Sequence, residues 1–446
     1  MSRERGKLVY KCYRALTTTL SPLLQIYLRW RKFRGLEHPT RWPERLGRAS
    51  LPRPPGLLIW FHAVSLGEGM AAIPVIRSCV RKRPDLNILM TTTTVSAFEV
   101  LRNQLPSCVI YQFAPIDAPA SLDAFLGHWK PNAIILVESE LWPNLIMGAS
   151  KSGIMLALIN ARISTKSLKR WSLPISYPLI TLMLSKFALI VPLSMTEAIH
   201  FQLLQAPPFV ISFSVDLKYA VEECETPKAS LEHVGDLQVQ LLDRMVWMAS
   251  SIHKGEEKVI LGVHEVLVQR YPNMVTIIVP RHPQHGQDIA LELKTKGLNV
   301  AVRSHHDELT QRTNIYLVDT LGELRCFYRL ATVAVVGGSF LPGLAGHNIS
   351  EAAAAGCAVV IGPHIGQFSH MVSAMQRLNP LAVIQVSSKV DLISVLSELF
   401  GNPKILEARR SAAKQAFHSL SSGVVAHVWN LLSQHVLYKL FAQDGH

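Results

Sequence analysis

The chain has 446 residues, of which 49% are hydrophobic, and a formal net charge of +13. The length suits two domains of ordinary size, and the composition is that of a globular protein rather than a disordered or collagen-like one. The positive charge indicates an anionic partner. Because no basic run is interleaved with aromatic residues and no nucleic-acid-binding module is recognisable, we expect a substrate or a membrane surface and no nucleic acid.

The six cysteines lie far apart in the sequence, and none belongs to a Cys-x-x-Cys pair. This spacing favours neither a zinc ribbon nor a disulfide framework. We therefore expect reduced and mostly buried thiols.

The first 34 residues are the most basic part of the chain. A moderately apolar stretch, residues 15–28, lies between Lys and Arg on both sides. It is shorter than the ~18 apolar residues that cross a membrane. The pattern predicts a helix lying in a membrane interface; an organelle-targeting segment and a plain surface helix are the alternatives. The residues expected to touch the membrane are Leu16, Leu20, Leu23, Leu24 and Tyr27.

From residue 57 onward, short apolar runs alternate with amphipathic stretches. The strands predicted in the first series are residues 57–61, 88–90, 109–113, 133–137, 155–159 and 189–191. After an irregular region at residues 205–245, the second series comprises residues 246–249, 275–279, 300–302, 315–318, 333–336, 359–361 and 383–386. Two helices, residues 405–419 and 424–441, end the chain. Such alternation predicts parallel sheets with helices on both faces.

The fold class we predict is therefore α/β, with two Rossmann-like, doubly wound domains facing a cleft. The expected parts are a basic membrane-associating segment (residues 1–34), a first Rossmann-like domain (35–215) and a second Rossmann-like domain (216–446). We expect the last helix to pack back on the first domain. Ligands should bind at the carboxyl ends of the strands.

Residues 337–351 connect a predicted strand to a helix through several glycines. Such a turn can hold a phosphate, because glycines let the backbone approach it and first-turn amides point at it. The alternative is a tight turn that merely needs small residues. Asn348 and Glu351 lie one helical turn apart and could reach the same ligand.

Two acidic motifs follow strands of the first series. Glu68 lies at the start of a helix, in a turn flanked by glycines. It could be a general base, or an acid that is favoured there by the helix dipole. The dipole would keep the Glu68 carboxylate ionised. Glu138 and Glu140 end a very apolar strand and should point to the same side of it. Paired acids there favour acid/base chemistry or a metal, although no Asp-x-Asp metal motif occurs in the chain.

Basic residues also follow predicted strands. Lys218 could hold a leaving phosphate or simply be solvated. Arg281 suits bidentate contact with an anion. His282 and His285 are separated by a proline and have no cysteine nearby, so a zinc site is not expected.

Taken together, these motifs resemble the family of 3-deoxy-D-manno-octulosonic acid (Kdo) transferases. The resemblance runs from residues 41–47 (RWPERLG) to the terminal helices. The other stretches that match the family are residues 62–68 (HAVSLGE), 138–144 (ESELWPN), 160–164 (NARIS), 280–283 (PRHP) and 337–351 (GGS…GHNISE).

The resemblance implies an inverting, metal-independent glycosyltransferase of GT-B fold that moves Kdo from CMP-Kdo to a lipid A precursor. By the same resemblance Glu68 is the catalytic base, and Glu138 and Lys218 stabilise the transition state. The positions implied for CMP contact are Pro280, Arg281, Leu321, Gly322, Glu323, Asn348, Ile349, Ser350 and Glu351. No cofactor is implied.

The sequence departs from the family pattern in places. The family's Gly-x-Leu-Lys is Val215-Asp216-Leu217-Lys218 here, so its glycine is lost. Such divergence resembles plant relatives and favours a mitochondrial membrane over a bacterial inner membrane. The alternatives are a glycolipid-binding relative with weak or no turnover and a GT-B enzyme that uses another sugar nucleotide.

Overall fold

The computed structural model describes residues 2–213, 216–223 and 235–440 of the chain. The chain forms two compact units, which are described separately below: unit 1 comprises residues 1–224 and 423–446, and unit 2 residues 225–422. The division thus falls at residue 224 rather than after residue 215. Residue 215 and residue 441, the end of the last helix expected from the sequence, lie outside the described residues.

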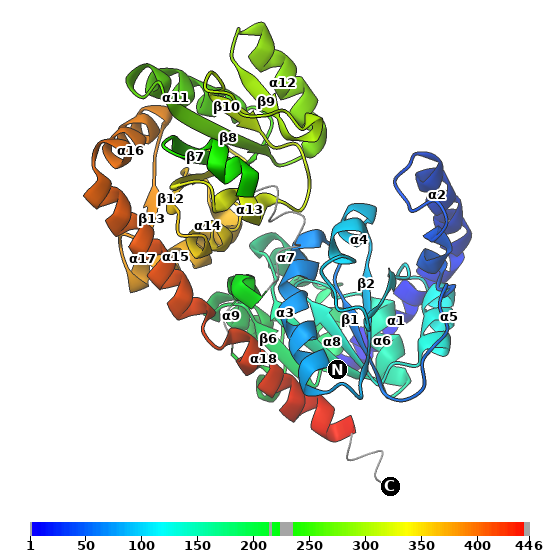
Figure 1. Cartoon of the computed structure of the whole chain (residues 1–446). Coiled ribbons are helices and arrows are strands. Elements are labelled where there is room, and N and C mark those ends of the chain that lie inside the picture. Colours follow the sequence, from blue (N-terminus) through cyan, green and yellow to red (C-terminus); the bar gives the residue numbers. More distant parts are fainter. Residues whose placement is uncertain (1, 214–215, 224–234, 441–446) are drawn as a thin grey trace. The chain divides into compact units, whose positions relative to one another are not determined.

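Unit 1 contains a six-stranded sheet in the order β3-β2-β1-β4-β5-β6, in which the paired strands are parallel (Figure 1). Its strands are β1 (Leu58–His62), β2 (Asn87–Thr92), β3 (Ile110–Phe113), β4 (Ala133–Val137), β5 (Met155–Ala161) and β6 (Leu189–Pro192). The order reverses between β1 and β4. Ligands bind at such a switch point in doubly wound sheets, because the connections diverge there to opposite faces.

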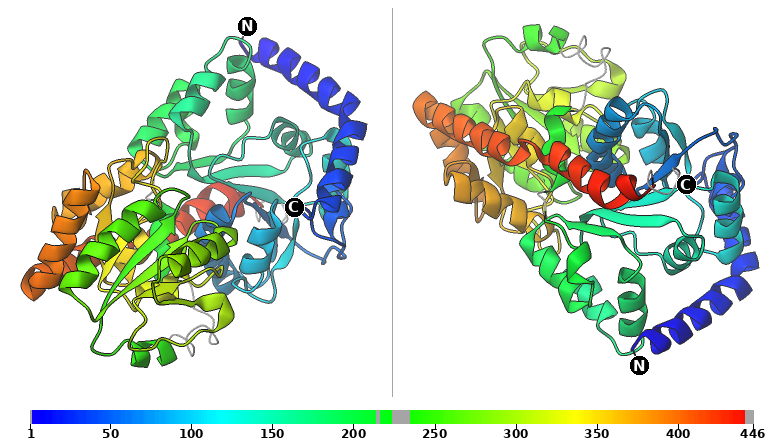
Figure 2. Two further views of the ribbon diagram at one scale, coloured as in Figure 1. Left: turned by 90° about the horizontal axis from the view of Figure 1, so that it is seen from above. Right: turned by 90° about the horizontal axis from the view of Figure 1, so that it is seen from below.

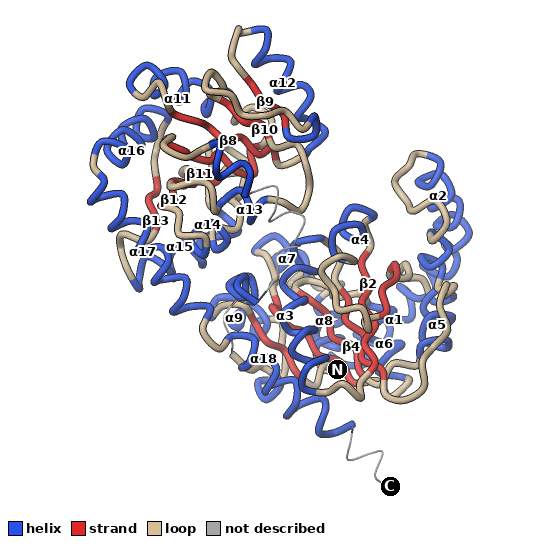
Figure 3. The backbone as a smooth tube through the Cα atoms, in the orientation of Figure 1, coloured by secondary structure: helices blue, strands red, loops and turns tan. Residues whose placement is uncertain are grey.

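Helices cover both faces of this sheet, as the tube drawing in Figure 3 shows. Along β1, Ile59 and Phe61 belong to one core cluster and Leu58 and Trp60 to another. Burial on both faces explains why the strands are continuous apolar runs. The helices are α3 (Leu66–Lys82), α4 (Val95–Leu101), α5 (Pro119–Trp129), α6 (Pro143–Lys151), α7 (Thr165–Trp171), α8 (Tyr177–Leu184), α9 (Met195–Leu203) and α18 (Val424–Leu432), with short turns η1 (Trp42–Leu46), η2 (Pro208–Val210), η3 (Leu217–Glu223) and η7 (Ser433–Leu437).

The C-terminal helix α18 is part of unit 1. It lies beside α3 in Figure 1, and Val428 and Trp429 belong to the same core cluster as Ile73 and Ile76 of α3. The last turns of the described chain therefore complete the core of unit 1.

The N-terminal segment consists of α1 (Ser2–Thr19) and α2 (Ser21–Phe33), seen in blue in Figure 2. The single helix expected at residues 15–28 is wrong, because the helix ends at Thr19 and Pro22 begins the next one. Helix α1 packs on α8, where an added Cβ on Gly6 would collide with the Pro178 carbonyl oxygen.

Helix α2 is the more exposed of the two. Several large apolar side chains on it face solvent, with Phe33 89% exposed. The others are Leu23, Ile26, Tyr27 and Trp30. Among the described residues no helix combines the length and the apolar content needed to cross a bilayer.

Unit 2 contains a seven-stranded sheet in the order β13-β12-β11-β7-β8-β10-β9, again with parallel pairings. Its strands are β7 (Met245–Ile252), β8 (Met274–Pro280), β9 (Val300–Val302), β10 (Ile315–Leu317), β11 (Val333–Val336), β12 (Ala358–Ile361) and β13 (Val383–Gln385). Its helices are α11 (Glu257–Arg270), α12 (Gly286–Thr295), α13 (Leu324–Tyr328), α14 (Ser350–Ala354), α15 (Ser369–Leu378), α16 (Lys389–Gly401) and α17 (Pro403–Ser421), with short turns η4 (Pro283–His285), η5 (Arg303–His305) and η6 (Gly366–Phe368). The order reverses between β7 and β11. The prediction of two doubly wound α/β domains is confirmed, with strand ends shifted by a few residues.

Candidate active site

Three of the residues singled out in the sequence meet at the carboxyl edge of the unit 1 sheet. Glu68 follows β1 and Glu138 follows β4, the two strands that flank the switch point. Lys218, in η3, pairs with Glu138 across this edge. Residues far apart in the sequence are therefore neighbours where such sheets bind ligands.

Glu68 forms a capping box at the start of α3. Its Oε2 accepts hydrogen bonds from the Val64 amide at 2.6 Å and the Ser65 amide at 3.3 Å, while the Ser65 hydroxyl accepts one from the Glu68 amide. Burial raises the pKa of Glu68, against the effect of the Val64 bond, and the Glu138 charge raises it further. For the pKa of Glu68, desolvation thus outweighs the amide bonds of the helix start, which act to lower it.

Glu138 and Lys218 form a buried ion pair, with Lys218 Nζ 2.5 Å from Glu138 Oε1. Burial lowers the pKa of Lys218, but the charges of Asp216 and Glu138 outweigh it, so that the pKa is raised. Asp216 Oδ1 accepts hydrogen bonds from the Lys218 amide and from Asn160 Nδ2. Lys218 is thereby held as a cation, although the family's glycine is missing from this segment.

Glu138 lies outside the strand and has φ 59°, in the left-handed region that non-glycine residues rarely adopt. The prediction that Glu138 and Glu140 point to one side of an extended strand is therefore wrong. Asn160, at the end of β5, also has positive φ, 51°. Backbone strain of this kind clusters at functional sites, where the surrounding structure holds it.

Glu140 lies beside His62, with Glu140 Oε2 3.9 Å from His62 Nε2. Burial, followed by the charge of Glu68, raises the pKa of Glu140 to about 8. Burial and the nearby Arg45 charge lower the pKa of His62 to about 3. Both of these groups are therefore neutral at pH 7.

In unit 2 the glycine turn after β11 surrounds a carboxylate of the protein itself. Glu256 is fully buried, and its two oxygens accept hydrogen bonds from four amides at 2.8–3.0 Å. The donors are the amides of His253, Gly338, Ser339 and Phe340. Glu256 therefore occupies the amides of residues 338–340, and a phosphate contact with the first-turn amides that follow Asn348 stays a prediction.

Next to this turn, His253, His347 and Arg281 lie at the carboxyl edge of the unit 2 sheet. His253 Nε2 lies 2.8 Å from His347 Nε2, and the two rings stack at 5.1 Å. Burial, followed by the charge of Arg281, lowers the pKa of His347 to about 3. Arg281 follows β8, and its amide bonds to the Ile252 carbonyl. The switch point between β7 and β11 is thus lined by neutral rings close to one cation.

The remaining residues expected to contact CMP lie on the same carboxyl side of the unit 2 strands. Glu323 accepts two hydrogen bonds from Arg303, and Glu351 accepts one from Arg325. Asn348 Oδ1 accepts bonds from the amide and hydroxyl of Ser350 at the start of α14. Of the other residues, Pro280 ends β8, Leu321 is exposed, Gly322 has φ 87°, and Ile349 is buried.

The part of the chain that the structure describes contains no group of three or more His, Cys, Asp or Glu side chains that could hold a metal. The rings of His282 and His285 meet edge to face, with their centroids 5.8 Å apart and an interplanar angle of 63°.

Sequence reasoning missed two features of these edges. The sequence predictions give Glu256 no role, because three of its four amide partners are more than 80 residues away. The His253–His347 pair joins residues 94 positions apart. One feature of the sequence could have suggested that these residues are neighbours. Glu256, His253 and His347 all belong to motifs that follow strands of the same predicted sheet.

The family described as 3-deoxy-D-manno-octulosonic-acid transferase (kdotransferase) matches residues 40–221. The Arabidopsis thaliana protein named "Probable 3-deoxy-D-manno-octulosonic acid transferase, mitochondrial" is 60% identical over 432 residues, covering 97% of each chain. The Haemophilus influenzae 3-deoxy-D-manno-octulosonic acid transferase is 29% identical and covers 95% of this chain and 98% of its own.

Among solved structures, the UDP-GlcNAc 2-epimerase from Neisseria meningitidis bound to UDP-GlcNAc has a TM-score of 0.57 at 14% identity. It covers 85% of this chain and 99% of its own. This likeness concerns the fold alone, the GT-B arrangement of two Rossmann-like domains. The relatives identify the lineage: the chain belongs to the 3-deoxy-D-manno-octulosonic acid (Kdo) transferase family.

Proposed function

We propose that this protein is an inverting glycosyltransferase that moves Kdo from CMP-Kdo to a lipid A precursor. Family membership supports the reaction class. The observation that carries it is the meeting of Glu68 with the Glu138–Lys218 pair at the switch point of unit 1. A base beside a buried cation is what attack by a sugar hydroxyl on an activated sugar requires.

In this proposal Glu68 removes the proton from the acceptor hydroxyl. The hydroxyl oxygen then forms a bond to the anomeric carbon of Kdo, and the bond from that carbon to the phosphate oxygen breaks. CMP leaves with the electron pair, and the configuration inverts. Only Oε2 of Glu68 is used by the capping box, so Oε1 can take the proton.

The Glu138–Lys218 pair stabilises the charges that develop in this step. Because the pair is buried, its field acts with little screening by water. The Lys218 amide donates to Asp216 Oδ1, which also accepts from Asn160 Nδ2, and these bonds anchor the backbone that carries Lys218. We therefore expect little reorganisation of the pair during reaction.

We assign CMP to the carboxyl edge of unit 2. Arg281 supplies a cation for the leaving phosphate, and Glu323 and Glu351, each held by an arginine, offer acceptors for hydroxyl groups. Ile349 and Ser350 are buried, so we expect them to shape the loop rather than present side chains. No step calls for a metal ion, so activity should persist in a chelator such as EDTA.

We further propose that the N-terminal segment lies on a membrane surface, in the mitochondrion. The exposed apolar side chains of α2 and the arginines and lysines beside them support the first part. The similarity to the Arabidopsis protein named mitochondrial supports the second. Flotation with anionic vesicles should weaken in salt and on removal of residues 1–34; undiminished flotation of the shortened protein would contradict it.

The test of the function is transfer of labelled Kdo from CMP-Kdo to a lipid A precursor by the purified full chain. We expect a Kdo-extended glycolipid, with CMP released in equal amount. Glycolipid binding without transfer would favour the binding-protein alternative, and turnover of a UDP- or GDP-sugar instead would favour another GT-B enzyme.

A further inference from the structure

Residues 160–164, one of the stretches that match the family, contain an arginine to which the proposed mechanism gives no role. Arg162 follows β5, the strand next to β4, at the carboxyl edge of the unit 1 sheet. Its side chain is 17% exposed, so part of it reaches the surface of this edge. A guanidinium beside a proposed substrate site is suited to contact with an anionic group of the substrate.

The end of β5 is bonded to both segments that carry the Glu138–Lys218 ion pair. The Arg162 amide donates to the Glu138 carbonyl at 3.2 Å. Two residues earlier, Asn160 Oδ1 accepts a 2.9 Å hydrogen bond from the amide of Leu217, the residue before Lys218. Arg162 is therefore fixed beside the proposed catalytic groups by the same backbone that positions them.

The contact of Arg162 with Glu197 is a long one. Arg162 Nε lies 4.0 Å from Glu197 Oε1, which is too far for a hydrogen bond. The other oxygen of Glu197 accepts a 2.6 Å hydrogen bond from the Ile163 amide and lies 3.4 Å from His200 Nδ1. Glu197 thus serves mainly the backbone that follows β5 and the first turn of α9.

A second cation lies near Arg162 at this edge. Burial lowers the pKa of Lys218, and the charge of Arg162 lowers it further, against the charges of Asp216 and Glu138, which raise it overall. Two like charges that interact in this way are each favoured by an additional anion between or beside them. The edge therefore suits a substrate that brings its own negative charge.

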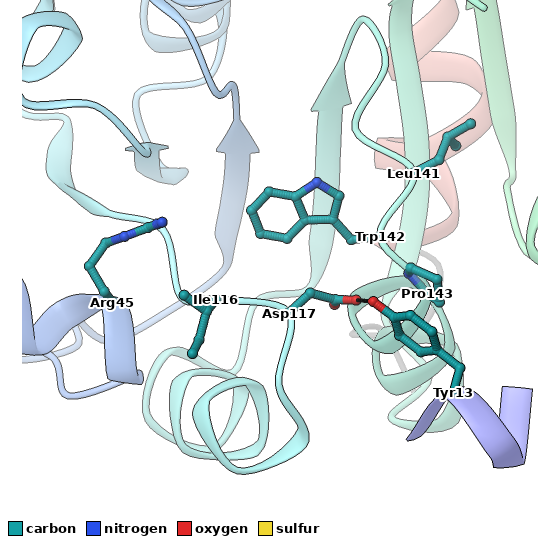
Figure 4. Close-up of a pocket in the computed structure, with 7 residues that line it drawn as sticks. All are labelled: Tyr13, Arg45, Ile116, Asp117, Leu141, Trp142 and Pro143. Carbon is teal, nitrogen blue, oxygen red and sulfur yellow. Dashed lines mark hydrogen bonds between the residues drawn. The ribbon is translucent and has the colours of Figure 1, made fainter. Parts of the chain in front are cut away.

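Another arginine, at the far end of the loop that begins with Glu138, is less suited to this task. Arg45 lines a pocket of about 330 Å³ together with Trp142 and Asp117 (Figure 4). Its Nη1 donates to the Ala114 carbonyl and its Nε is buried. A carboxylate bound in this pocket would face the carboxyl group of Asp117, so the balance of charge favours the edge at Arg162.

The sugar that moves in the proposed reaction is itself an acid. In a 2-ulosonic acid such as Kdo, the carboxyl group is bonded directly to the anomeric carbon, and it is ionised at neutral pH. Since the hydroxyl activated by Glu68 attacks that carbon, the carboxylate lies one bond away from the point of reaction. Removing such a charge from water is costly unless a cation pairs with it.

We infer that Arg162 binds the carboxylate of the transferred sugar and thereby makes the edge of unit 1 selective for an ulosonic acid. The inference rests on the proposed function in one respect, namely that this sugar is Kdo. A guanidinium presents two parallel N–H groups that match the two oxygens of a carboxylate. Held in this way, the carboxylate fixes the rotation of the sugar, so that the anomeric carbon faces the hydroxyl that Glu68 activates.

The test compares CMP-Kdo with its C1 methyl ester, each binding to the full chain without acceptor, measured by calorimetry. Wild type should prefer the free carboxylate by about 10- to 100-fold, the range for a hydrogen bond between charged groups. Arg162→Lys, which keeps the charge but not the fork, should lose about tenfold of this preference, and Arg162→Met should bind both donors equally. The matched control is Arg170→Lys, exposed on α7 of the same unit, which should keep the wild-type preference.

Equal affinities of wild type for the two donors would overturn the inference, as would an undiminished preference in Arg162→Met, since another cation would then bind the carboxylate. Methylguanidinium added to Arg162→Ala should restore part of the preference, which a merely structural arginine would not explain. The wild-type comparison stands even if the variants fold poorly. Preference for the carboxylate without any Kdo transfer would refute the proposed function and support this site; transfer without preference would do the opposite.

Discussion

In each unit a glutamate follows the first strand of the sheet and lies at the start of the next helix. Glu68 lies in the first turn of α3, the helix after β1, and Glu256 directly precedes α11, the helix after β7. Both carboxylates accept hydrogen bonds from backbone amides, but Glu256 uses both oxygens for four amides, whereas Glu68 uses one oxygen for two. Equivalent positions thus hold one carboxylate that is fully bonded and one that is not.

The difference shows how a structural acid is told from a reactive one. A carboxylate whose lone pairs are taken by amides stabilises a loop and has little capacity left for a proton. One that keeps an oxygen free, and whose pKa is raised by burial and by a neighbouring acid, is suited to take a proton near neutral pH. The partner of each acid differs as well: Glu68 lies near an ion pair, Glu256 near a pair of stacked imidazoles.

The largest expected effect comes from Glu68→Gln, which keeps the size of the side chain and removes the base. General-base contributions are about 10²–10⁴-fold, so kcat should fall by that amount while CMP affinity hardly changes. Glu256→Gln is the matched control. It should lower the melting temperature, because an amide NH₂ would replace one acceptor facing backbone NH groups, and its folded fraction should keep a far higher kcat than Glu68→Gln. Near-normal turnover in Glu68→Gln with a lowered melting temperature would assign Glu68 to capping alone.

The next effect concerns the ion pair that distinguishes the edge of unit 1. Lys218→Met should reduce the free energy of unfolding by about 3–5 kcal/mol, because it leaves Glu138 charged and buried. The double variant Glu138→Gln/Lys218→Met should recover part of that stability but no activity, as measured by denaturant unfolding and Kdo transfer. Arg83→Met, which breaks the exposed pair with Asp85, should cost less than about 1 kcal/mol. Turnover in the double variant would contradict the proposed role of the Glu138–Lys218 pair in the mechanism.

The sequence predicts the strands well for a physical reason. A parallel strand buried on both faces must be apolar throughout, and residues 133–137 and 333–336 show this without ambiguity. The positions of Glu68 and Glu138 followed from the rule that such strands present ligands at their carboxyl ends. Their meeting with Lys218 was implied only by the resemblance.

What the sequence could not supply were contacts between distant residues and local departures from regular geometry. The role of Glu256 depends on amides some 80 positions away, and without them the glycine turn looked like a phosphate site. The left-handed conformation of Glu138 breaks the alternation that an extended strand would follow.

A smaller effect is expected in unit 2, where Arg281 is proposed to meet the leaving phosphate. Arg281→Ala should raise the donor KM by about tenfold and lower kcat less, if the contact is equally strong in the ground and transition states. Arg244→Ala is a control in the same unit, because Arg244 bonds to the carbonyls of Asn273, Thr310 and Thr313 away from the proposed site. An unchanged donor KM in Arg281→Ala would place the phosphate elsewhere.

The smallest effect is a pH dependence of stability that arises from Glu140. Its pKa is raised to about 8 in the folded protein from an ordinary 4.5, so between these values unfolding releases a proton. The free energy of unfolding therefore falls as pH rises through this window, by at most about 1.4 kcal/mol per pH unit, and is flat outside it. His62 acts in the opposite sense, because its pKa is lowered to about 3 from 6.5, but its window ends at pH 6.5. Between pH 6.5 and 8, Glu140→Gln should thus become progressively more stable relative to the wild type, as denaturant unfolding at several pH values would show. A constant difference across that range would mean that Glu140 is already ionised in the folded protein at pH 6.5.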